Sequence, residues 1–450
     1  MELPMDDDNL LERALASARD TRSLLVRAGA RHDVGDVFSK LFGSASCIVI
    51  ADENTFAAAG KDAYDSLRAT GRVCHEPFIL ESDDLYAEYS YVDRIKAAIG
   101  PGDAIPVAVG SGAINDLTKL AAHLCGRQYL SVATAASMDG YTAFGASITR
   151  DGSKQTFDCP APIGVVADLE TIAAAPEGLN ASGYADLVAK CPAGADWIVA
   201  DCLGIDPIDP ANWEMVQTRL RYWMSDPAAI KRGDIQALDR LTTALMITGF
   251  AMQAACSSRP VSGAEHQFSH LWDMEHHTHE GSTPSHGFKV GIGTLSSIAL
   301  YDALIKLGVE DLDIEAAARN WPDAEANRQE ITELFPSQEL RAKAYLESGE
   351  KHIDRDRLRT HLRLLKQQWS RIRERLAQQL IRRDEVYSML EAAGCPVKPN
   401  QIGISRERLR ISFRKAFHIR RRFTVLDVAR RTNLWDQALN IVFSQSDLRA

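Results

Sequence analysis

Histidines are concentrated in one short segment of the chain. Six of the twelve histidines lie between residues 266 and 286. His266 and His270 are four residues apart and would share one face of a helix. His286 follows a Gly-Ser-Thr-Pro break and precedes an apolar run, which predicts a helix start at this residue. Two imidazoles and a carboxylate that leave one coordination position open would form a catalytic site for a divalent metal ion.

The carboxylate has to come from another part of the chain. Asp186 is a candidate, because it lies in a segment of small and apolar residues, 181–190, that predicts the start of a helix. An aspartate buried there without a metal ion or a base would be costly; a plain acid in the first turn of a helix is the alternative. The other histidines of the cluster, at 276, 277 and 279, alternate with acidic residues, which favours a solvated loop or a weak secondary metal site.

A glycine-rich turn follows a predicted strand at 105–109. The sequence there is Gly110-Ser-Gly112-Ala113-Ile114-Asn115-Asp116, and a helix is expected to follow. Glycines at such a turn let the backbone approach a pyrophosphate, and the helix N-terminus offers free N–H groups and a positive dipole end. The third glycine of the dinucleotide fingerprint is missing, since Asn115 stands in its place. A turn without a ligand therefore remains an alternative, and no Walker-type phosphate motif occurs.

Two further segments could support a nucleotide cofactor. Asp52 ends the first clear strand, where a carboxylate can accept hydrogen bonds from ribose hydroxyls; a helix-capping acid is the alternative. The segment 132–141 contains Thr134, Ser137 and Asp139 and ends in an Asp-Gly turn. These small hydroxyl residues suit contacts to a cofactor and to a polyol, although an ordinary loop has the same composition.

The elements that position these residues follow from the hydrophobic pattern. Strands are predicted to alternate with helices in the first part of the chain, and a hairpin is predicted around Asp151-Gly152. The predicted strands are 46–51, 76–80, 103–109, 128–132 and 163–168, and the predicted helices are 57–70, 84–99 and 115–125. Beyond about Leu169 the β-branched runs nearly vanish. We therefore expect an α/β fold with a Rossmann-like parallel-sheet domain, 1–168, and an all-α domain, 169–450.

The composition excludes several classes of protein. With 45% hydrophobic and 25% charged residues, the chain is neither collagen, nor a coiled coil, nor wholly disordered. The apolar stretch 241–258 is interrupted by polar residues and predicts a core helix, so we expect no membrane span. The start of the chain is acidic and lacks an export signal, which predicts a cytoplasmic protein. Eight scattered cysteines without a C-x-x-C pair predict reduced core thiols.

Positive charge is gathered in the segment 351–430, although the formal net charge of the chain is −10. A basic segment can hold nucleic acid or phosphorylated ligands. Here the basic residues alternate with Leu, Ile and Trp at helical spacing and no runs of stacking aromatics occur. This pattern favours solvated helix faces, and we expect no nucleic-acid partner.

Three motifs together resemble the sn-glycerol-1-phosphate dehydrogenases, most closely their bacterial, arabinose-operon branch. They are Gly110–Asp116, Thr134–Gly140, and the segment 262–270 with His286-Gly287; the segment 419–427 resembles the end of that branch. The resemblance covers roughly residues 45 to 430. It implies the superfamily of dehydroquinate synthase and the iron-dependent alcohol dehydrogenases, with a Rossmann-like lobe, a helical lobe and an active site in the cleft.

The resemblance also implies roles for individual residues. Gly110 and the turn that follows it would hold the pyrophosphate of NAD(P), and Thr134 and Ser137 would contact the cofactor. Asp139 would bind substrate, and His270 would contact it and relay a proton. The metal ligands would be Asp186, His266 and His286. Asp186 would also lie near the substrate.

The implied reaction is the interconversion of dihydroxyacetone phosphate and sn-glycerol 1-phosphate by hydride transfer with NAD(P)(H). One divalent ion per subunit, zinc or nickel, would polarise the ketone. The basic stretch Arg414–Arg422 is a candidate source of a phosphate contact, with solvation as the alternative for most of its residues. Glycerol dehydrogenase and dehydroquinate synthase activities remain open, as does a catalytically silent metal- or nucleic-acid-binding regulator. We expect a homodimer that binds a small phosphorylated triose or polyol as its substrate.

Overall fold

The computed structural model describes residues 7–81, 85–150 and 153–444. It divides into two compact units. Unit 1 comprises the chain up to Leu187 together with Glu214–Ser258 and Ala392–Gly394; unit 2 comprises Val188–Trp213, Arg259–Glu391 and the chain from Cys395 onward. The limits of these units differ from the expected domain boundary at 168/169, which stays a prediction.

Unit 1 contains a parallel sheet of six strands in the order β1-β8-β5-β4-β2-β3. Its strands are β1 Ser23–Arg27, β2 Cys47–Asp52, β3 Phe78–Leu80, β4 Ile105–Gly110, β5 Leu130–Ala133 and β8 Gly164–Asp168. A separate antiparallel hairpin is formed by β6 Ala146–Arg150 and β7 Ser153–Phe157. This parallel sheet confirms the α/β fold class, which the alternation of strands and helices in the sequence had predicted.

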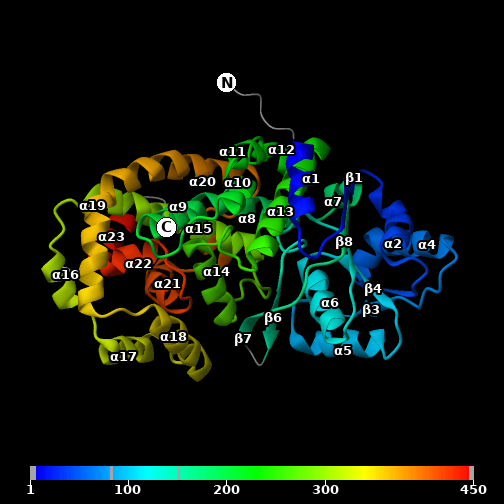
Figure 1. Cartoon of the computed structure of the whole chain (residues 1–450), viewed down its shortest axis with the longest axis horizontal. Helices are drawn as coiled ribbons and strands as arrows, with labels where there is room; N and C mark the ends of the chain where they lie inside the picture. The colour runs from blue at the N-terminus through cyan, green and yellow to red at the C-terminus, as the bar shows by residue number, and fades with distance from the viewer. Residues whose placement is uncertain (1–6, 82–84, 151–152, 445–450) are drawn as a thin grey trace. The chain divides into compact units, whose positions relative to one another are not determined.

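Both faces of the sheet are covered by helices, so its central strands are buried throughout. In β2, Ile48 and Ile50 point into a cluster with residues of α5 and α6, whereas Val49 points to the opposite face, against α2 and α4. Helices α5 and α6 pack against each other, as do α2 and α4 (Figure 1). Burial on both faces explains why these strands are continuous apolar runs rather than alternating ones.

Helices make up the remaining regular structure of the described residues. In chain order they are α1 Asp7–Ser17, η1 Ala30–Asp33, α2 Val34–Phe42, α3 Glu53–Thr55, η2 Phe56–Gly60, α4 Lys61–Ala69, α5 Tyr89–Ile99, α6 Gly112–Leu124, α7 Leu169–Ala173, α8 Glu177–Val188, α9 Lys190–Cys202, α10 Pro210–Gln217, α11 Leu220–Trp223, α12 Pro227–Lys231, α13 Ile235–Ala255, α14 Ala264–Met274, α15 His286–Leu307, α16 Ile314–Asn320, α17 Ala324–Leu334, α18 Gln338–Lys351, α19 Arg355–Gln379, α20 Arg383–Ala392, η3 Pro399–Ile402, α21 Arg406–His418, α22 Val425–Arg431 and α23 Trp435–Val442.

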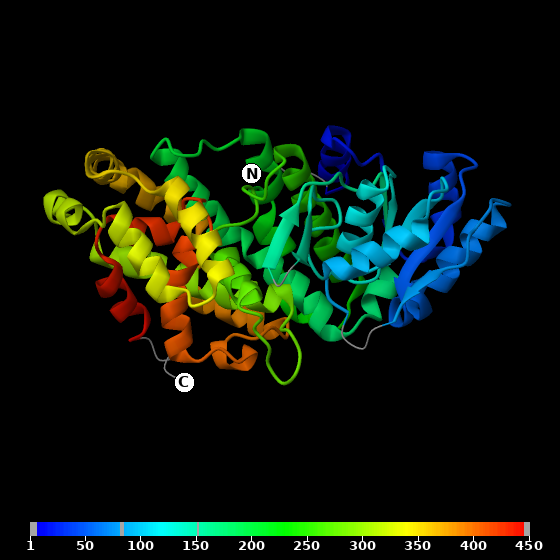
Figure 2. The ribbon, with the colours of Figure 1, turned by 90° about the horizontal axis from the view of Figure 1, so that it is seen from below.

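Unit 2 is built around α14 and α15. The C-terminal helices α21, α22 and α23, orange-red to red, pack against these two helices (Figures 1 and 2). Their shared core includes Phe268 and Trp272 of α14, Leu300 of α15 and Phe413 of α21. The described residues after β8 contain no strand, in agreement with the expected helical part of the chain.

The structure adds one strand that the hydrophobic pattern did not predict and refines three other points. After the helix α1, the segment Ser23–Arg27 forms β1, an edge strand beside β8. The predicted hairpin is confirmed by β6 and β7, although Asp151 and Gly152 lie outside the described residues. All eight cysteines are free. By length and composition α15 could cross a membrane, but 78% of its apolar window is buried inside the protein, as in an ordinary core helix.

Candidate functional site

Helices α14 and α15 bring three histidines together. His266 and His270 lie one turn apart on α14, and His286 is the first residue of α15, which Ser285 caps by accepting a hydrogen bond from a backbone N–H. The ring of His286 lies 5.3 Å from that of His266 and 6.3 Å from that of His270, between centroids. The predicted helical positions of these histidines are confirmed.

A glycine allows the two helices to approach this closely. A Cβ atom built on Gly293 of α15 would lie 2.4 Å from the backbone oxygen of Glu265 in α14. No ordinary side chain fits at that distance, so Gly293 determines how near the His266 turn lies to α15. Sequence reasoning had not selected this residue.

Asp186 lies near the end of α8, not at a helix start as its sequence context had suggested. The helix begins earlier than expected, at Glu177, and a new helix follows at Lys190. Gly183, one turn before Asp186, packs against the segment that carries Asp139: a Cβ atom there would lie 1.8 Å from the oxygen of Ala136. Asp186 is fully buried, and its Oδ2 accepts a hydrogen bond of 3.1 Å from the backbone N–H of Asp139.

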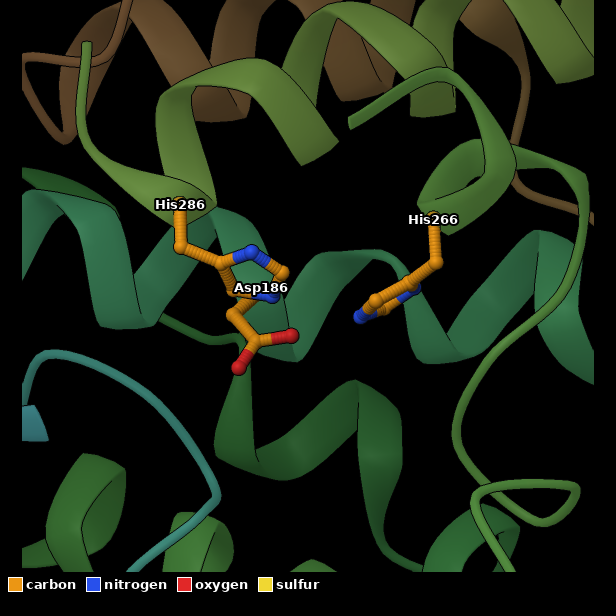
Figure 3. A group of neighbouring side chains, drawn as sticks. All are labelled: Asp186, His266 and His286. Carbon is orange, nitrogen blue, oxygen red and sulfur yellow. The ribbon is translucent and has the colours of Figure 1, made fainter. Parts of the chain in front are cut away.

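Asp186, His266 and His286 each offer one ligand atom, and these atoms lie within 4.8 Å of one another (Figure 3). Asp186 and His266 are buried and His286 is half-buried. One carboxylate and two imidazoles form a donor set that suits zinc, nickel or another divalent transition metal. These residues therefore fit a metal ion of the kind that the sequence pattern predicted.

The ring nitrogens of both candidate histidine ligands have protein neighbours on the Nδ1 side. His266 Nδ1 lies 2.8 Å from Oε1 of Glu265, and His286 Nδ1 lies 3.4 Å from Oγ of Ser269. A carboxylate that accepts from Nδ1–H fixes the tautomer and leaves Nε2 as the nitrogen able to bind a metal. Glu265 thus orients His266, a role that its position before the histidine did not reveal.

A second buried carboxylate holds the first turn of α14. Asp196 accepts hydrogen bonds from the backbone N–H of Ala264 at 2.7 Å, from that of Val425 at 2.8 Å and from the Tyr301 hydroxyl at 2.6 Å. Burial, and then the charge of Glu265, raise the pKa of Asp196 to about 7. The network ties α14 to α15 and to the start of α22.

The glycine-rich turn has the form expected of an anion site. α6 begins at Gly112, and no side chain caps its N-terminus. A Cβ atom on Gly110 would lie 2.5 Å from Cβ of Ile114, so the turn itself requires glycine there. A Cβ atom on Gly112 would meet only the flexible side chain of Met138, at 3.2 Å or more. Open backbone N–H groups at a helix start fit a pyrophosphate.

Asn115 and Asp116, by contrast, form hydrogen bonds with other groups of the protein. Asn115 Oδ1 accepts from the hydroxyls of Tyr129 and Ser131, and Asp116 Oδ2 accepts from the backbone N–H of Ser147. Lys119, one turn further along α6, donates to three backbone oxygens of the segment 140–145. These side chains hold the strands and loops around the turn, and the cofactor contacts of Asn115 and Asp116 stay predictions.

Thr134, Ser137 and Asp139 are buried in the segment after β5. The backbone N–H of Thr134 donates to the oxygen of Gly110 at 3.2 Å, which places the segment beside the glycine-rich turn. Their predicted contacts to cofactor and substrate are untested.

Asp52 serves as a helix cap. Its Oδ1 accepts a hydrogen bond of 2.8 Å from the backbone N–H of Thr55, and the Thr55 hydroxyl oxygen accepts one of 3.1 Å from the backbone N–H of Asp52. The residue also stands at the carboxyl end of β2, where a ribose contact was predicted. The capping interpretation is confirmed, and the ribose contact stays a prediction.

Two expectations about solvated residues need correction. His277 is buried between the oxygen of Ile402 and the guanidinium of Arg408, so it belongs to the core rather than to a solvated loop. The basic stretch Arg414–Arg422 is not solvated throughout: Arg420 donates a hydrogen bond of 3.0 Å to Nδ1 of His270. Neither contact could be anticipated from spacing, because each joins segments more than 120 residues apart.

Comparison with known proteins first places the chain in a class. Residues 25–176 match the family model of iron-containing alcohol dehydrogenases. The fold resembles that of a probable glycerol dehydrogenase from Sinorhizobium meliloti 1021, with a TM-score of 0.61 and 15% identity over 94% of this chain and 98% of the other. A glycerol dehydrogenase from Schizosaccharomyces pombe gives a TM-score of 0.58 and 15% identity, covering 95% and 91%. These likenesses show that the chain shares its fold with the two glycerol dehydrogenases.

The sequence relatives are more specific, and all three described here are named glycerol-1-phosphate dehydrogenase (NAD(P)+). That of Halalkalibacterium halodurans is 36% identical over 56% of this chain and 64% of its own length. That of Bacillus velezensis is 31% identical, covering 61% and 72%, and that of Methanothermobacter thermautotrophicus is 31% identical, covering 62% and 78%. The chain belongs to the NAD(P)-dependent glycerol-1-phosphate dehydrogenase family.

Proposed function

We propose that this protein interconverts dihydroxyacetone phosphate and sn-glycerol 1-phosphate, with NAD(P)(H) as the hydride carrier. The observation that carries the proposal is the convergence of Asp186, His266 and His286 in a chain of this family. A carbonyl reduction needs a group that stabilises the developing alkoxide, and a metal ion bound by three protein ligands with a position left open supplies it.

Asp186, His266 and His286 would hold the metal ion, proposed here as zinc or nickel. Its contribution when bound is Lewis-acid polarisation of the ketone oxygen. Imidazole and carboxylate ligands suit both ions, so the donor set does not choose between them. Glu265 keeps the His266 ring in one orientation, which reduces the cost of assembling the site.

The cofactor would bind at the turn from Gly110 to Gly112. The uncapped N-terminus of α6 provides backbone N–H groups for the pyrophosphate. Thr134 and Ser137 follow β5 beside this turn and would contact the cofactor, while Asp52, at the end of β2, would contact the ribose. The hydride itself belongs to the cofactor chemistry, and the protein supplies binding and orientation.

His270 would contact substrate and move a proton, and Asp139 would bind a substrate hydroxyl. Because the Arg420 guanidinium can only donate, Nδ1 of His270 accepts the bond between them. The proton of the neutral ring is therefore on Nε2, the atom from which His270 would donate toward the reduced oxygen. A homodimer and a cytoplasmic location stay predictions.

The proposal is tested by stripping the full-length protein with a chelator and reloading it separately with zinc and with nickel. NADH oxidation should require dihydroxyacetone phosphate, should stop in the stripped protein and should return with at least one metal. Glycerol phosphate should form in proportion to the NADH consumed. Metal-loaded protein that binds NADH but does not oxidise it with this substrate would contradict the proposal.

A further inference from the structure

Arg420 lies in the connection between α21 and α22, beside the histidine cluster of unit 2. Its Nη2 donates to Nδ1 of His270 at 3.0 Å. The ring of His270 in turn lies 6.1 Å from that of His266 and 6.3 Å from that of His286. The guanidinium therefore stands next to the candidate substrate-binding histidine and near two candidate metal ligands.

The charge of Arg420 has no carboxylate partner. Within the part of the chain that the structure describes, no Asp or Glu oxygen lies within 4.0 Å of its nitrogens. The next residue differs, because Arg421 pairs with Glu347 at 3.0 Å. Arg420 is half-buried, and desolvation lowers the pKa of its guanidinium. A partly desolvated cation without a counter-ion is unfavourable unless an anion joins it.

Two further arginines make the surroundings of Arg420 positive. Arg422 is half-buried, and desolvation, followed by the charges of Arg259 and Arg420, lowers its pKa to about 9. Arg422 donates to the backbone oxygen of Ser262, and Arg259 pairs with Asp206 at 2.7 Å. These two side chains are thus engaged by the protein, whereas Arg420 retains N–H groups for another acceptor.

We propose that the Arg420 guanidinium binds the phosphate group of the substrate and so selects phosphorylated ketones over free ones. This inference rests on the proposed function. Arginine presents five N–H donors in a planar fork that matches phosphate oxygens. One donor faces His270, and the others are available to the phosphate.

The size of the substrate agrees with this assignment. In dihydroxyacetone phosphate only a methylene group and an ester oxygen separate the carbonyl carbon from phosphorus. The phosphate must therefore bind close to the residues that handle the carbonyl, and Arg420 is one hydrogen bond away from His270. The same side chain would then position both the phosphate and the proton-donating ring.

The test uses full-length, metal-loaded protein and two substitutions. Arg420→Met removes all donors, while Arg420→Gln removes the charge but keeps a donor for Nδ1 of His270. The control is Arg414→Met, from the same basic stretch, whose exposed guanidinium pairs with Asp436. The measured quantity is kcat/KM with NADH for dihydroxyacetone phosphate and for dihydroxyacetone.

Both Arg420 variants should lose about 10- to 100-fold in the ratio of the two kcat/KM values, because charge-assisted hydrogen bonds to the phosphate are lost. Arg414→Met should leave the ratio unchanged. Equal losses for both ketones in Arg420→Gln and Arg420→Met would overturn the inference and assign Arg420 to orienting His270 alone. An unchanged ratio in Arg420→Gln would also overturn it, even if Arg420→Met failed to fold.

Calorimetry with inorganic phosphate gives a readout that does not depend on turnover. Wild-type protein and Arg414→Met should bind phosphate with similar affinity, and Arg420→Gln should bind it at least about tenfold more weakly. Equal affinities in all three would contradict the inference. A wild-type protein with no preference for the phosphorylated ketone would instead remove the proposed function, so the two failures are distinguishable.

Discussion

Oε1 of Glu265 lies 2.8 Å from Nδ1 of His266, the residue that follows it on α14. The same oxygen accepts the backbone N–H of Gly263, so the carboxylate is fixed at the first turn of the helix. Two adjacent residues thereby combine a candidate metal ligand with the group that orients it. Such outer carboxylates raise the basicity of a ligating histidine and restrict its ring.

Replacing Glu265 by alanine should therefore weaken metal binding about 10- to 100-fold without removing any proposed ligand. The measurement is competition of the metal-loaded protein against a chelator of known affinity. Glu275→Gln is the control, because Glu275 directly follows the same helix but pairs with Arg408 and Lys415. Unchanged affinity in Glu265→Ala would show that the contact is structural only.

Alanine at any one of Asp186, His266 and His286 should remove bound metal and most activity together. Each would supply one of only three protein ligands, so the effects of double substitutions should not add. His270→Ala should retain the metal and lose turnover. Metal content by elemental analysis and kcat are measured on the same samples, and a metal-free His270→Ala protein would make His270 a ligand.

Asp52→Ala should reduce the preference for NADH over NADPH, since a carboxylate near the ribose repels a 2′-phosphate. The same change removes a helix cap, which costs about 0.5–2 kcal/mol of stability. Asp234→Ala separates the two effects, because Asp234 caps α13 by accepting the N–H of Ala237. If Asp52→Ala and Asp234→Ala both keep the wild-type ratio of kcat/KM for the two cofactors, Asp52 acts only as a helix cap.

Glu347 predicts a pH dependence of stability. Burial alone would raise its pKa, but Arg421 and Lys343 outweigh burial and lower the pKa from 4.5 to about 2. A carboxyl group whose pKa is lower in the folded than in the unfolded state stabilises the fold at pH values above its unfolded-state pKa. That stabilisation is lost as the pH falls toward the folded-state pKa. The stabilisation by Glu347 should thus be complete above about pH 5 and decline between 4.5 and about 2.

The substitution Glu347→Gln should cost about 1–2 kcal/mol at neutral pH, after allowance for solvent screening. Thermal denaturation measures the Tm of variant and wild type, and their difference should shrink as the pH falls from 5 to 3. Glu350→Gln is the control, since Glu350 meets the same Arg421 at 3.7 Å but is exposed. A difference in Tm that is independent of pH would refute the electrostatic explanation.

Much of the fold was predictable because local pattern and final structure agree. The apolar runs of β2 and β4 are buried on both faces, and His286 begins a helix after a Gly-Pro-containing break. β1 was missed because its five residues are stabilised by pairing with β8, far away in the sequence. Such non-local pairing has no periodicity that a short segment could display.

The residues of the candidate site also fall into two groups, those that the sequence indicates and those that only the three-dimensional structure reveals. Residue type and spacing, with the family resemblance, selected Asp186, His266 and His286, which the fold then brings together. The bond from Arg420 to His270 spans 150 positions and depends on how α21 packs against α14. The buried carboxylate of Asp196, which holds the start of α14, is likewise recognised only from its three-dimensional partners.

The most direct test of the central claim compares kcat/KM of the metal-loaded wild-type protein for dihydroxyacetone phosphate and for dihydroxyacetone, with NADH as the reductant. Preorganised donors to a phosphate contribute binding energy that also positions the carbonyl for hydride transfer. The account predicts that the phosphorylated ketone is favoured by about tenfold or more for each charge-assisted contact. Comparable kcat/KM values for the two ketones would contradict the glycerol-1-phosphate assignment and favour a glycerol dehydrogenase activity.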